Sequence, residues 1–526
     1  MLQSSKKRPS LQSIVSLFVC FSALFILAYQ TMDRSIWSDE AMLLLNYPLD
    51  SLSDIFNPLP LYAQSTSPLL SVLLSLFGNE NSTLLRAGTF VLLAGGILVA
   101  FRLHKASLVQ QAAAVLTILS MPIMLTYVTE VKHYGYEILG ASIAIGWLIK
   151  KDPSEVIRFQ DVVLLCLSLM TGFSTLIITF LALATYQFEH TKLTRKVSLK
   201  NLIFVILFTL ATFLYYLVLK HAASLQLANF SDSYAIEGGV AILRFVFVVI
   251  VVASPVIPVV ILTCILLNKR MHLPHVHRFV IYSIMVFVTF ILLSFLGLYT
   301  VESPRHGAWV SAFVLAAILL SVELYPTIQR VLYRRIYAAL LLIFILLPSG
   351  YTVKEIFTDE GMLERIDQKP IINFLANHEP VTIGLWFCGQ PMIEYFIKSN
   401  PELAKHNYIG IRNNQSTVPN DFSNLPHDKI VKTLEDNINS PGSWVQSIAY
   451  YRQGKGMDVM AQAMVNEAPK NSDFYIYAGL MTYDGAEIFE TYSQKSLLDT
   501  LESNNCSHKP ALTVTKAFIL QVNCKG

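Results

Sequence analysis

The chain has 526 residues, of which 54% are hydrophobic and only 14% are charged, and its mean hydropathy is +0.51. Soluble domains carry about 25% charged residues, so most of this chain is predicted to lie in a membrane. A formal net charge of +3 excludes a strongly basic nucleic-acid binder, and six cysteines without a CxxC pair exclude a disulfide scaffold and a zinc ribbon.

Acidic residues divide the chain into two parts. Residues 1–350 hold 16 of the Asp and Glu residues, and residues 351–526 hold the other 20. We therefore expect a membrane domain over 1–350 and a soluble α/β domain over 351–526. In the second part, short apolar runs predict a helix beginning at Gln390 and strands at 381–386, 472–477 and 512–515.

Apolar runs long enough for membrane helices recur through the first part, since a helix needs about 20 such residues to cross. They lie near 11–30, 84–103, 108–128, 134–149, 201–219, 240–267, 279–299, 308–325 and 336–349. The first run has no small-residue cleavage site after it and is interpreted as a retained anchor. Pro255 and Pro258 predict a kink in one span. A further run, 161–187, is broken around Gly172.

Lys and Arg residues orient these spans, because cytoplasmic loops are enriched in them. With the N-terminus inside, the inside loops hold 18 Lys and Arg residues and the outside loops hold five: Arg34, Arg86, Lys132, Lys220 and Arg305. This count requires both ends of 161–187 to lie inside, so that segment crosses twice or turns back at Gly172. We expect ten or eleven helical passes, with the soluble domain outside.

The longest outside loop, 32–83, has an amphipathic pattern that predicts short helices lying on the membrane surface. Asp39 and Glu40 stand in it directly after the first span. They can be solvated loop residues or a helix N-cap. Alternatively, a carboxylate held at the water–lipid boundary is a candidate general base for an acceptor hydroxyl.

Two other outside loops carry candidate functional residues. Glu130, Lys132 and Tyr134 lie where the span 134–149 begins, and alone they fit an interfacial ion pair with an aromatic-belt tyrosine. Arg86 and the pair Arg305-His306 also lie at helix ends, where a lone Arg often extends to the lipid headgroups. Taken together, these cations could hold the phosphate of a lipid carrier.

The order of these features resembles a known family. An N-terminal anchor, Asp39-Glu40, Arg86, Glu130-x-Lys132-x-Tyr134, the break at Gly172, Pro304-Arg305-His306 and a soluble C-terminal domain follow one another. This pattern over about 1–350 resembles the GT-C glycosyltransferases, particularly bacterial members similar to the protein O-mannosyltransferases and the lipid A aminoarabinose transferase (glycosyltransferase family 39).

The resemblance implies sugar transfer from a polyprenyl-phosphate donor to a lipid, glycan or protein acceptor, outside the cytoplasmic membrane of a bacterium. It gives Asp39 the role of general base, with Glu40 its neighbour, and gives Glu130 the role of assisting or orienting the acceptor. Donor-phosphate binding would fall to Arg86, Lys132, Tyr134, Arg305 and His306. Direct displacement would invert the anomeric carbon. The partners are the donor, the acceptor and membrane lipids, without nucleic acid.

One segment departs from the family pattern. Relatives often carry a His-Pro-Pro-like stretch in the first outside loop, whereas this chain reads Gln64-Ser65-Thr66-Ser67-Pro68-Leu69. Only Pro68 matches, so no histidine role is carried over. We expect no required cofactor, and the missing histidine weakens the case for a divalent cation.

Several features leave alternatives open. A transporter, ligase or polymerase of lipid-linked glycans would share many of them, although a transporter should place charges near mid-membrane. A membrane-anchored sensor would need fewer spans. The stretch His272–His277 fits a solvated loop or a lipid-headgroup contact better than a metal site. An oxidising compartment would permit a disulfide between Cys506 and Cys524.

Overall fold

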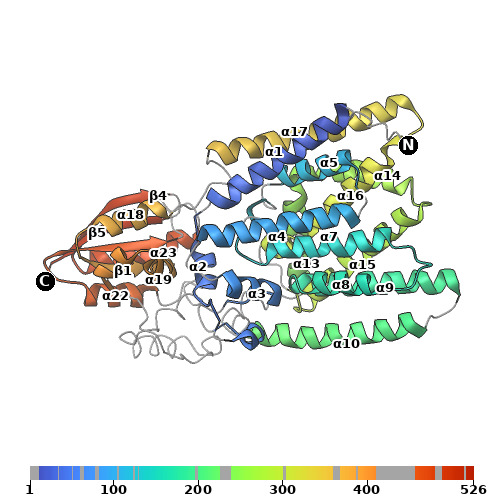
Figure 1. Ribbon diagram of the computed structural model, residues 1–526. Coiled ribbons are helices and arrows are strands. Elements are labelled where there is room, and N and C mark those ends of the chain that lie inside the picture. The colour runs from blue at the N-terminus through green and yellow to red at the C-terminus, as the bar shows by residue number, and fades with distance from the viewer. Residues whose placement is uncertain are drawn as a thin grey trace, which may run out of the picture.

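The computed structural model describes residues 11–33, 35–49, 51–59, 64–77, 82–103, 106–121, 125–127, 130–195, 199–224, 238–299, 304–358, 368–386, 389–409, 457–479, 488–514 and 517–525. Long helices lie side by side in a bundle, and a β-sheet with its own helices stands at one end of it (Figure 1). This arrangement confirms the predicted fold class, a mostly helical membrane protein with a C-terminal α/β domain.

The bundle contains the apolar runs of the sequence. Its helices are α1 (Leu11–Asp33), α4 (Ser82–Leu103), α5 (Leu108–Leu119), α7 (Tyr134–Lys150), α8 (Phe159–Leu169), α9 (Phe173–Thr194), α10 (Leu199–Ala222), α13 (Gly238–Ala253), α14 (Ile257–Asn268), α15 (Pro274–Phe295), α16 (Val310–Leu324) and α17 (Val331–Thr358). Among the described residues, four helices are long and apolar enough to cross a membrane, or five if the bent pair α13–α14 is one span. The total of ten or eleven passes therefore stays a prediction.

The segment between α1 and α4 forms short helices, as its amphipathic pattern predicts. They are α2 (Ser38–Leu44), η1 (Leu52–Phe56) and α3 (Pro68–Phe77). In Figure 1, α2 lies where the bundle meets the C-terminal domain. The described residues of this segment therefore form a layer between the bundle and the C-terminal domain.

Helices α8 and α9 form the hairpin that the charge pattern requires. At the start of α8, Asp161 Oδ2 accepts a hydrogen bond of 2.8 Å from Lys151 Nζ. At the end of α9, His190 Nδ1 lies 2.6 Å from the Pro153 carbonyl oxygen. Because Lys151 and Pro153 belong to one loop, both ends of the hairpin lie on the same side of the bundle, as predicted. That this side is the cytoplasmic one stays a prediction.

The hairpin turns at Gly172, where another helix approaches closely. The Glu137 carboxylate of α7 accepts hydrogen bonds from the backbone N–H groups of Phe173, at 2.7 Å, and Ser174, at 3.1 Å. It thereby satisfies donors that a helix N-terminus leaves without partners. A Cβ atom on Gly172 would lie 2.1 Å from Glu137 Cγ, so only glycine fits this contact.

Gly172→Ala is expected to lower the free energy of unfolding by about 1–3 kcal/mol, because a methyl group would push the buried Glu137 side chain out of place. Thermal unfolding in detergent measures this change. Gly95→Ala in α4 is the matched control, since a Cβ there meets nothing within 4 Å. Equal stability of the two variants would contradict the proposed packing.

The C-terminal domain contains a five-stranded sheet in the order β2-β1-β3-β5-β4. Its strands are β1 (Thr382–Trp386), β2 (Asn407–Ile409), β3 (Asp473–Gly479), β4 (Cys506–Val514) and β5 (Ala517–Cys524). Strands β1, β2 and β3 are parallel, whereas β5 runs antiparallel to β3 and β4. The predicted strands at 381–386 and 472–477 are confirmed. Of the predicted strand at 512–515, residues 512–514 are the end of β4, and Thr515 lies outside the described residues.

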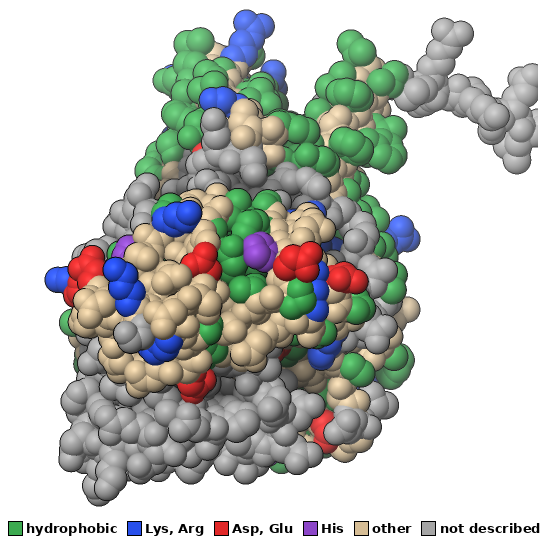
Figure 2. All heavy atoms as spheres, turned by 90° about the vertical axis from the view of Figure 1, so that its left-hand side faces the viewer, with side chains coloured by type: hydrophobic (Ala, Val, Ile, Leu, Met, Phe, Trp, Pro, Cys, Tyr) green, Lys and Arg blue, Asp and Glu red, His purple; other side chains and the backbone are tan. Residues whose placement is uncertain are grey.

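Helices cover both faces of this sheet. They are α18 (Lys369–Asn377), α19 (Gly389–Ser399), α22 (Met457–Glu467) and α23 (Ile488–Ser503), and α19 begins where the sequence predicts a helix. Figure 2 looks onto this domain and shows charged side chains spread over a largely polar surface. The helices that project behind it carry hydrophobic side chains. This contrast matches a soluble domain on a membrane bundle.

One hydrophobic core joins the C-terminal domain to the segment around α2. It combines Leu43, Leu44 and Tyr47 around α2 with Met392 and Ile393 of α19, all nearly inaccessible. Because successive strand residues alternate between faces, Trp386, Phe474 and Ile476 instead join a second core with α22 and α23. The domain is thus packed against α2 through its sheet-covering helix α19.

Cys506 and Cys524 form a disulfide between β4 and β5. They are directly opposite in the register of the two strands. The disulfide therefore links the edge strand β4 to its neighbour β5. This is the bond that the sequence analysis considered for an oxidising compartment.

Candidate active site

Helix α2 presents Asp39 and Glu40 in its first turn. Trp37 precedes the helix in extended conformation, and its backbone N–H donates a hydrogen bond of 3.2 Å to Glu40 Oε2. The N-cap position is occupied by Trp37 and not by Asp39 or Glu40 as one sequence interpretation expected; Glu40, the third residue of the helix, instead binds the N–H of the N-cap residue. Because neighbouring residues on a helix point about 100° apart, Asp39 and Glu40 have different partners.

Glu40 forms a buried ion pair with Arg86. The Arg86 Nη2 atom lies 2.8 Å from Glu40 Oε2, and the two side chains are 1% and 0% exposed. Arg86 also donates to the Ser35 carbonyl oxygen at 2.9 Å, and Glu40 Oε1 accepts the Val131 N–H at 2.7 Å. This pair fastens α2 to α4 and to the loop before α7.

Asp39 forms a second ion pair, with Arg305. Arg305 Nη1 lies 2.8 Å from Asp39 Oδ2, and the two side chains are 21% and 9% exposed. Arg305 belongs to η3 (Pro304–Gly307), whose His306 carbonyl oxygen accepts a hydrogen bond of 2.5 Å from the Tyr299 hydroxyl. Unlike the Glu40 pair, this one is partly accessible.

Lys132 lies beside the Asp39 pair. Its Nζ atom donates a hydrogen bond of 2.7 Å to Gln64 Oε1, and its side chain is buried. Burial lowers the pKa of Lys132, and the nearby Asp39 carboxylate opposes this shift. Glu130, also buried, acts on Lys132 in the same direction as Asp39. Two carboxylates and two cations therefore share one small volume.

Aromatic and imidazole rings form the wall on the α7 side. The Tyr134 ring lies 6.3 Å from the His306 ring and 4.4 Å from the His133 ring. Burial lowers the pKa of His133 to about 3, and the neighbouring Lys132, His306 and Arg305 add to the effect. His133 is therefore a neutral side chain at physiological pH.

The low pKa of His133 predicts a pH-dependent stability. Below about pH 6.5 the unfolded chain takes up a proton at this residue, whereas the folded chain does so only near pH 3. The folded state should therefore lose about 1.4 kcal/mol per pH unit as the pH falls below 6.5. His133→Gln should flatten this dependence between pH 6.5 and 5, measured by unfolding in detergent. His272→Gln, which removes an exposed imidazole, is the control, and an unchanged slope in His133→Gln would contradict the assignment.

All eight sequence-predicted site residues fall into two groups. Asp39, Arg305 and Lys132 lie together with the buried Glu130, and Tyr134 and His306 border them. Glu40 and Arg86 lie next to this group but bind each other in the interior. Their roles in catalysis and phosphate binding stay predictions.

Two contributors escaped the sequence analysis. Gln64 contacts both Lys132 and the Met42 sulfur atom, at 2.7 and 3.7 Å. Gln64 is the first residue of the stretch that departs from the family pattern, and that departure was a sequence signal that could have marked it. Tyr395 of α19 lies close enough to Glu40 and Arg86 for their charges to act on it, and burial raises its pKa to about 12. No local sequence pattern marks Tyr395.

The helical bundle, the sheet domain at one end and the charged cluster between them define the fold of a multi-pass membrane protein. Its fold is similar to that of ArnT from Cupriavidus metallidurans in the apo state, with 10% sequence identity, a TM-score of 0.50, and 97% of this chain and 98% of that chain covered. The structure of the same protein bound to undecaprenyl phosphate has 12% identity, the same coverage and a TM-score of 0.49. No family model and no curated protein matches the chain. The likeness confirms the fold that the sequence predicted.

Proposed function

We propose that this protein is an inverting membrane glycosyltransferase that transfers a sugar from a polyprenyl-phosphate donor to an acceptor on the outer side of the bacterial cytoplasmic membrane. The observation that carries the proposal is the partly accessible Asp39–Arg305 ion pair, with Lys132 beside it. The ArnT-like fold supports it, since the structurally similar protein also has a form that binds undecaprenyl phosphate.

The donor phosphate is expected to bind at Arg305 and Lys132. A phosphate oxygen competes with the Asp39 carboxylate for the Arg305 guanidinium, because both are anions that accept charge-assisted hydrogen bonds. Binding would thereby release Asp39 from its ion pair. The two cations would then stabilise the negative charge that develops on the leaving phosphate.

The released Asp39 carboxylate is expected to act as the general base. The acceptor hydroxyl oxygen attacks the anomeric carbon while its proton passes to Asp39, and the bond from that carbon to the phosphate oxygen breaks. The polyprenyl phosphate leaves with the bonding electron pair, and the configuration inverts. Glu130 would orient the acceptor, beside Lys132.

Glu40 and Arg86 support this site from behind. Both are buried and their charges compensate each other, so we assign them to holding α2, and with it Asp39, in position. This is a structural role rather than the direct one implied by the family resemblance.

Transfer from radiolabelled polyprenyl-phosphate sugars tests the proposal. Membranes that contain the protein should move label from the lipid fraction to an acceptor, and membranes without it should not. Product stereochemistry reports inversion. If no donor in a broad panel of hexoses and pentoses is turned over, the proposal fails and a transporter of lipid-linked glycans becomes the better hypothesis.

A further inference from the structure

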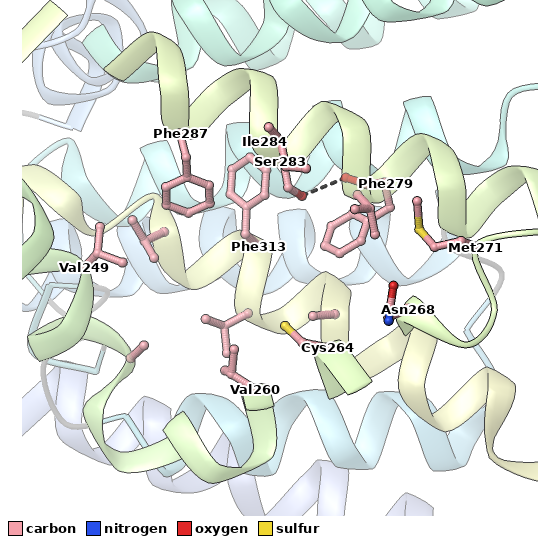
Figure 3. A pocket seen from close by; sticks show the side chains of 15 residues that line it. Val249, Val260, Cys264, Asn268, Met271, Phe279, Ser283, Ile284, Phe287 and Phe313 are labelled. Atoms are coloured by element: carbon pink, nitrogen blue, oxygen red, sulfur yellow. Dashed lines mark hydrogen bonds between the residues drawn. The ribbon is translucent and has the colours of Figure 1, made fainter. Parts of the chain in front are cut away.

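A cavity of about 360 Å³ lies among α13, α14, α15 and α16, away from the charged cluster. Its volume is within the range of about 300–1,000 Å³ typical of small-molecule sites. Figure 3 shows Phe279, Phe287 and Phe313 along its walls, with Asn268 and Met271 at one end. Almost the whole lining is apolar.

The helix kink explains why the cavity exists. Helix α13 ends at Ala253, η2 (Ser254–Val256) follows, and α14 leaves at 95° to α13. The predicted proline kink is thereby confirmed. Helix α13 packs on α15 and α14 packs on α16, whereas the described residues of α14 and α15 are at most sparsely in contact with each other. The cavity occupies the space between them.

One end of the cavity carries positive charge. Asn268 and Met271 line it, and Lys269 and Arg270 lie between these two residues in the turn from α14 to α15. Lys269 is exposed. Arg270 is fixed by a hydrogen bond of 2.6 Å from its Nη2 atom to the Thr327 carbonyl oxygen, and its buried Nε atom has no partner among the described residues.

Glu323, in the last turn of α16, has basic partners other than Lys269 and Arg270. Glu323 lies 3.0 Å from Lys150 Nζ and 3.9 Å from His275 Nε2, so it already has a basic partner. The α14–α15 turn lies at the end of the bundle remote from the C-terminal domain (Figure 1). Its charge therefore belongs to a surface separate from the Asp39–Arg305 pair.

The surroundings determine what can fill this cavity. Exposed apolar side chains on the same helices, such as Ile261, Ile265 and Leu292, face the membrane. Water is disfavoured inside, because a stable buried water needs several polar partners. A hydrocarbon chain would restore the dispersion contacts that an empty cavity loses, and an anionic headgroup would pair with basic side chains at the membrane surface.

We propose that this cavity binds one acyl chain of an anionic phospholipid, whose phosphate contacts Lys269 and Arg270. The apolar wall and the charged mouth together match the two halves of such a lipid. With this lipid bound, the neighbouring His272–His277 stretch would lie in the layer of lipid headgroups. This lipid is neither donor nor acceptor in the proposed reaction, and the inference does not depend on that reaction.

Native mass spectrometry of the full-length protein tests the site, after delipidation and addition of equal amounts of phosphatidylglycerol and phosphatidylcholine with the same acyl chains. The wild type should retain phosphatidylglycerol preferentially. Replacing both Lys269 and Arg270 by Gln should lower that preference, by about fivefold for each charge removed. Lys192→Gln with Arg195→Gln is the control, because these exposed basic residues lie on and directly after α9, which does not line the cavity.

Filling the cavity tests the acyl-chain part. Ala317→Phe should reduce retention of both lipids, whereas Ile261→Phe, on the membrane-facing side of α14, should not. Cys264→Leu is a smaller filling change on another helix, should Ala317→Phe fail to fold. Equal retention of the two lipids by the wild type, or retention unaffected by the filling variants, would overturn the proposal. Retention of polyprenyl phosphate in place of phosphatidylglycerol would also overturn it.

Discussion

Asp39→Asn is expected to lower the rate of sugar transfer by about 10²–10⁴-fold, the contribution typical of a positioned general base. The amide keeps the size of the carboxylate and one hydrogen-bond acceptor, but it cannot take the acceptor proton. Because the base acts in the transition state, kcat should fall strongly. KM for the donor should not rise, since an amide competes with the donor phosphate for Arg305 less than a carboxylate does. Initial rates in reconstituted membranes measure this.

Two matched variants separate this effect from a general loss of charge. Asp499→Asn removes an exposed carboxylate from α23 and should leave transfer unchanged. Glu130→Gln should reduce transfer less than Asp39→Asn and raise KM for the acceptor, since Glu130 is expected to orient it. If Asp39→Asn transfers sugar at the wild-type rate, at equal expression, another group is the base.

The charge asymmetry of the loops predicted that the candidate site residues lie on one side of the membrane, and the structure brings Asp39, Lys132 and Arg305 together. The sequence could not predict how those residues pair. Arg305 contacts Asp39 and Arg86 contacts Glu40, and the partners are 266 and 46 residues apart. Such pairings depend on how the helices pack, which no local pattern determines.

The hairpin α8–α9 was predictable for a different reason. Its break at Gly172 is visible in the sequence, and the charge count required both of its ends to lie on one side. The side chain that stabilises the turn was not predictable, since Glu137 reaches it from α7 and caps backbone groups of Phe173 and Ser174. The position of a residue along its own helix does not reveal which neighbouring helix its polar side chain will contact.

In the C-terminal domain, the period-2 patterns predicted strands but not the order of these strands in the sheet. Strand β2 has only three residues, Asn407–Ile409, and is therefore too short to give a pattern. The contact of α19 with α2 is tertiary, and it makes the soluble domain part of the wall behind Glu40 and Arg86. The sequence predicted a membrane domain and a C-terminal domain but gave no sign of the packing of α19 on α2.

The buried pair Glu40–Arg86 should contribute to stability far more than an exposed pair. Arg86→Met is expected to lower the free energy of unfolding by about 3–5 kcal/mol, because it leaves the Glu40 carboxylate uncompensated in the interior. Unfolding in detergent measures the loss. Lys150→Met, which breaks the more exposed pair with Glu323, should cost at most about 1 kcal/mol.

A double-mutant cycle then separates support from chemistry. Glu40→Gln removes the negative charge but keeps an oxygen that can accept the Val131 N–H. Combined with Arg86→Met, it should recover much of the lost stability, because no buried charge remains unpaired. If the pair acts only by holding α2, the double variant should also regain transfer activity. A stable double variant without transfer activity would instead place Glu40 or Arg86 in the reaction itself, as the family resemblance implies.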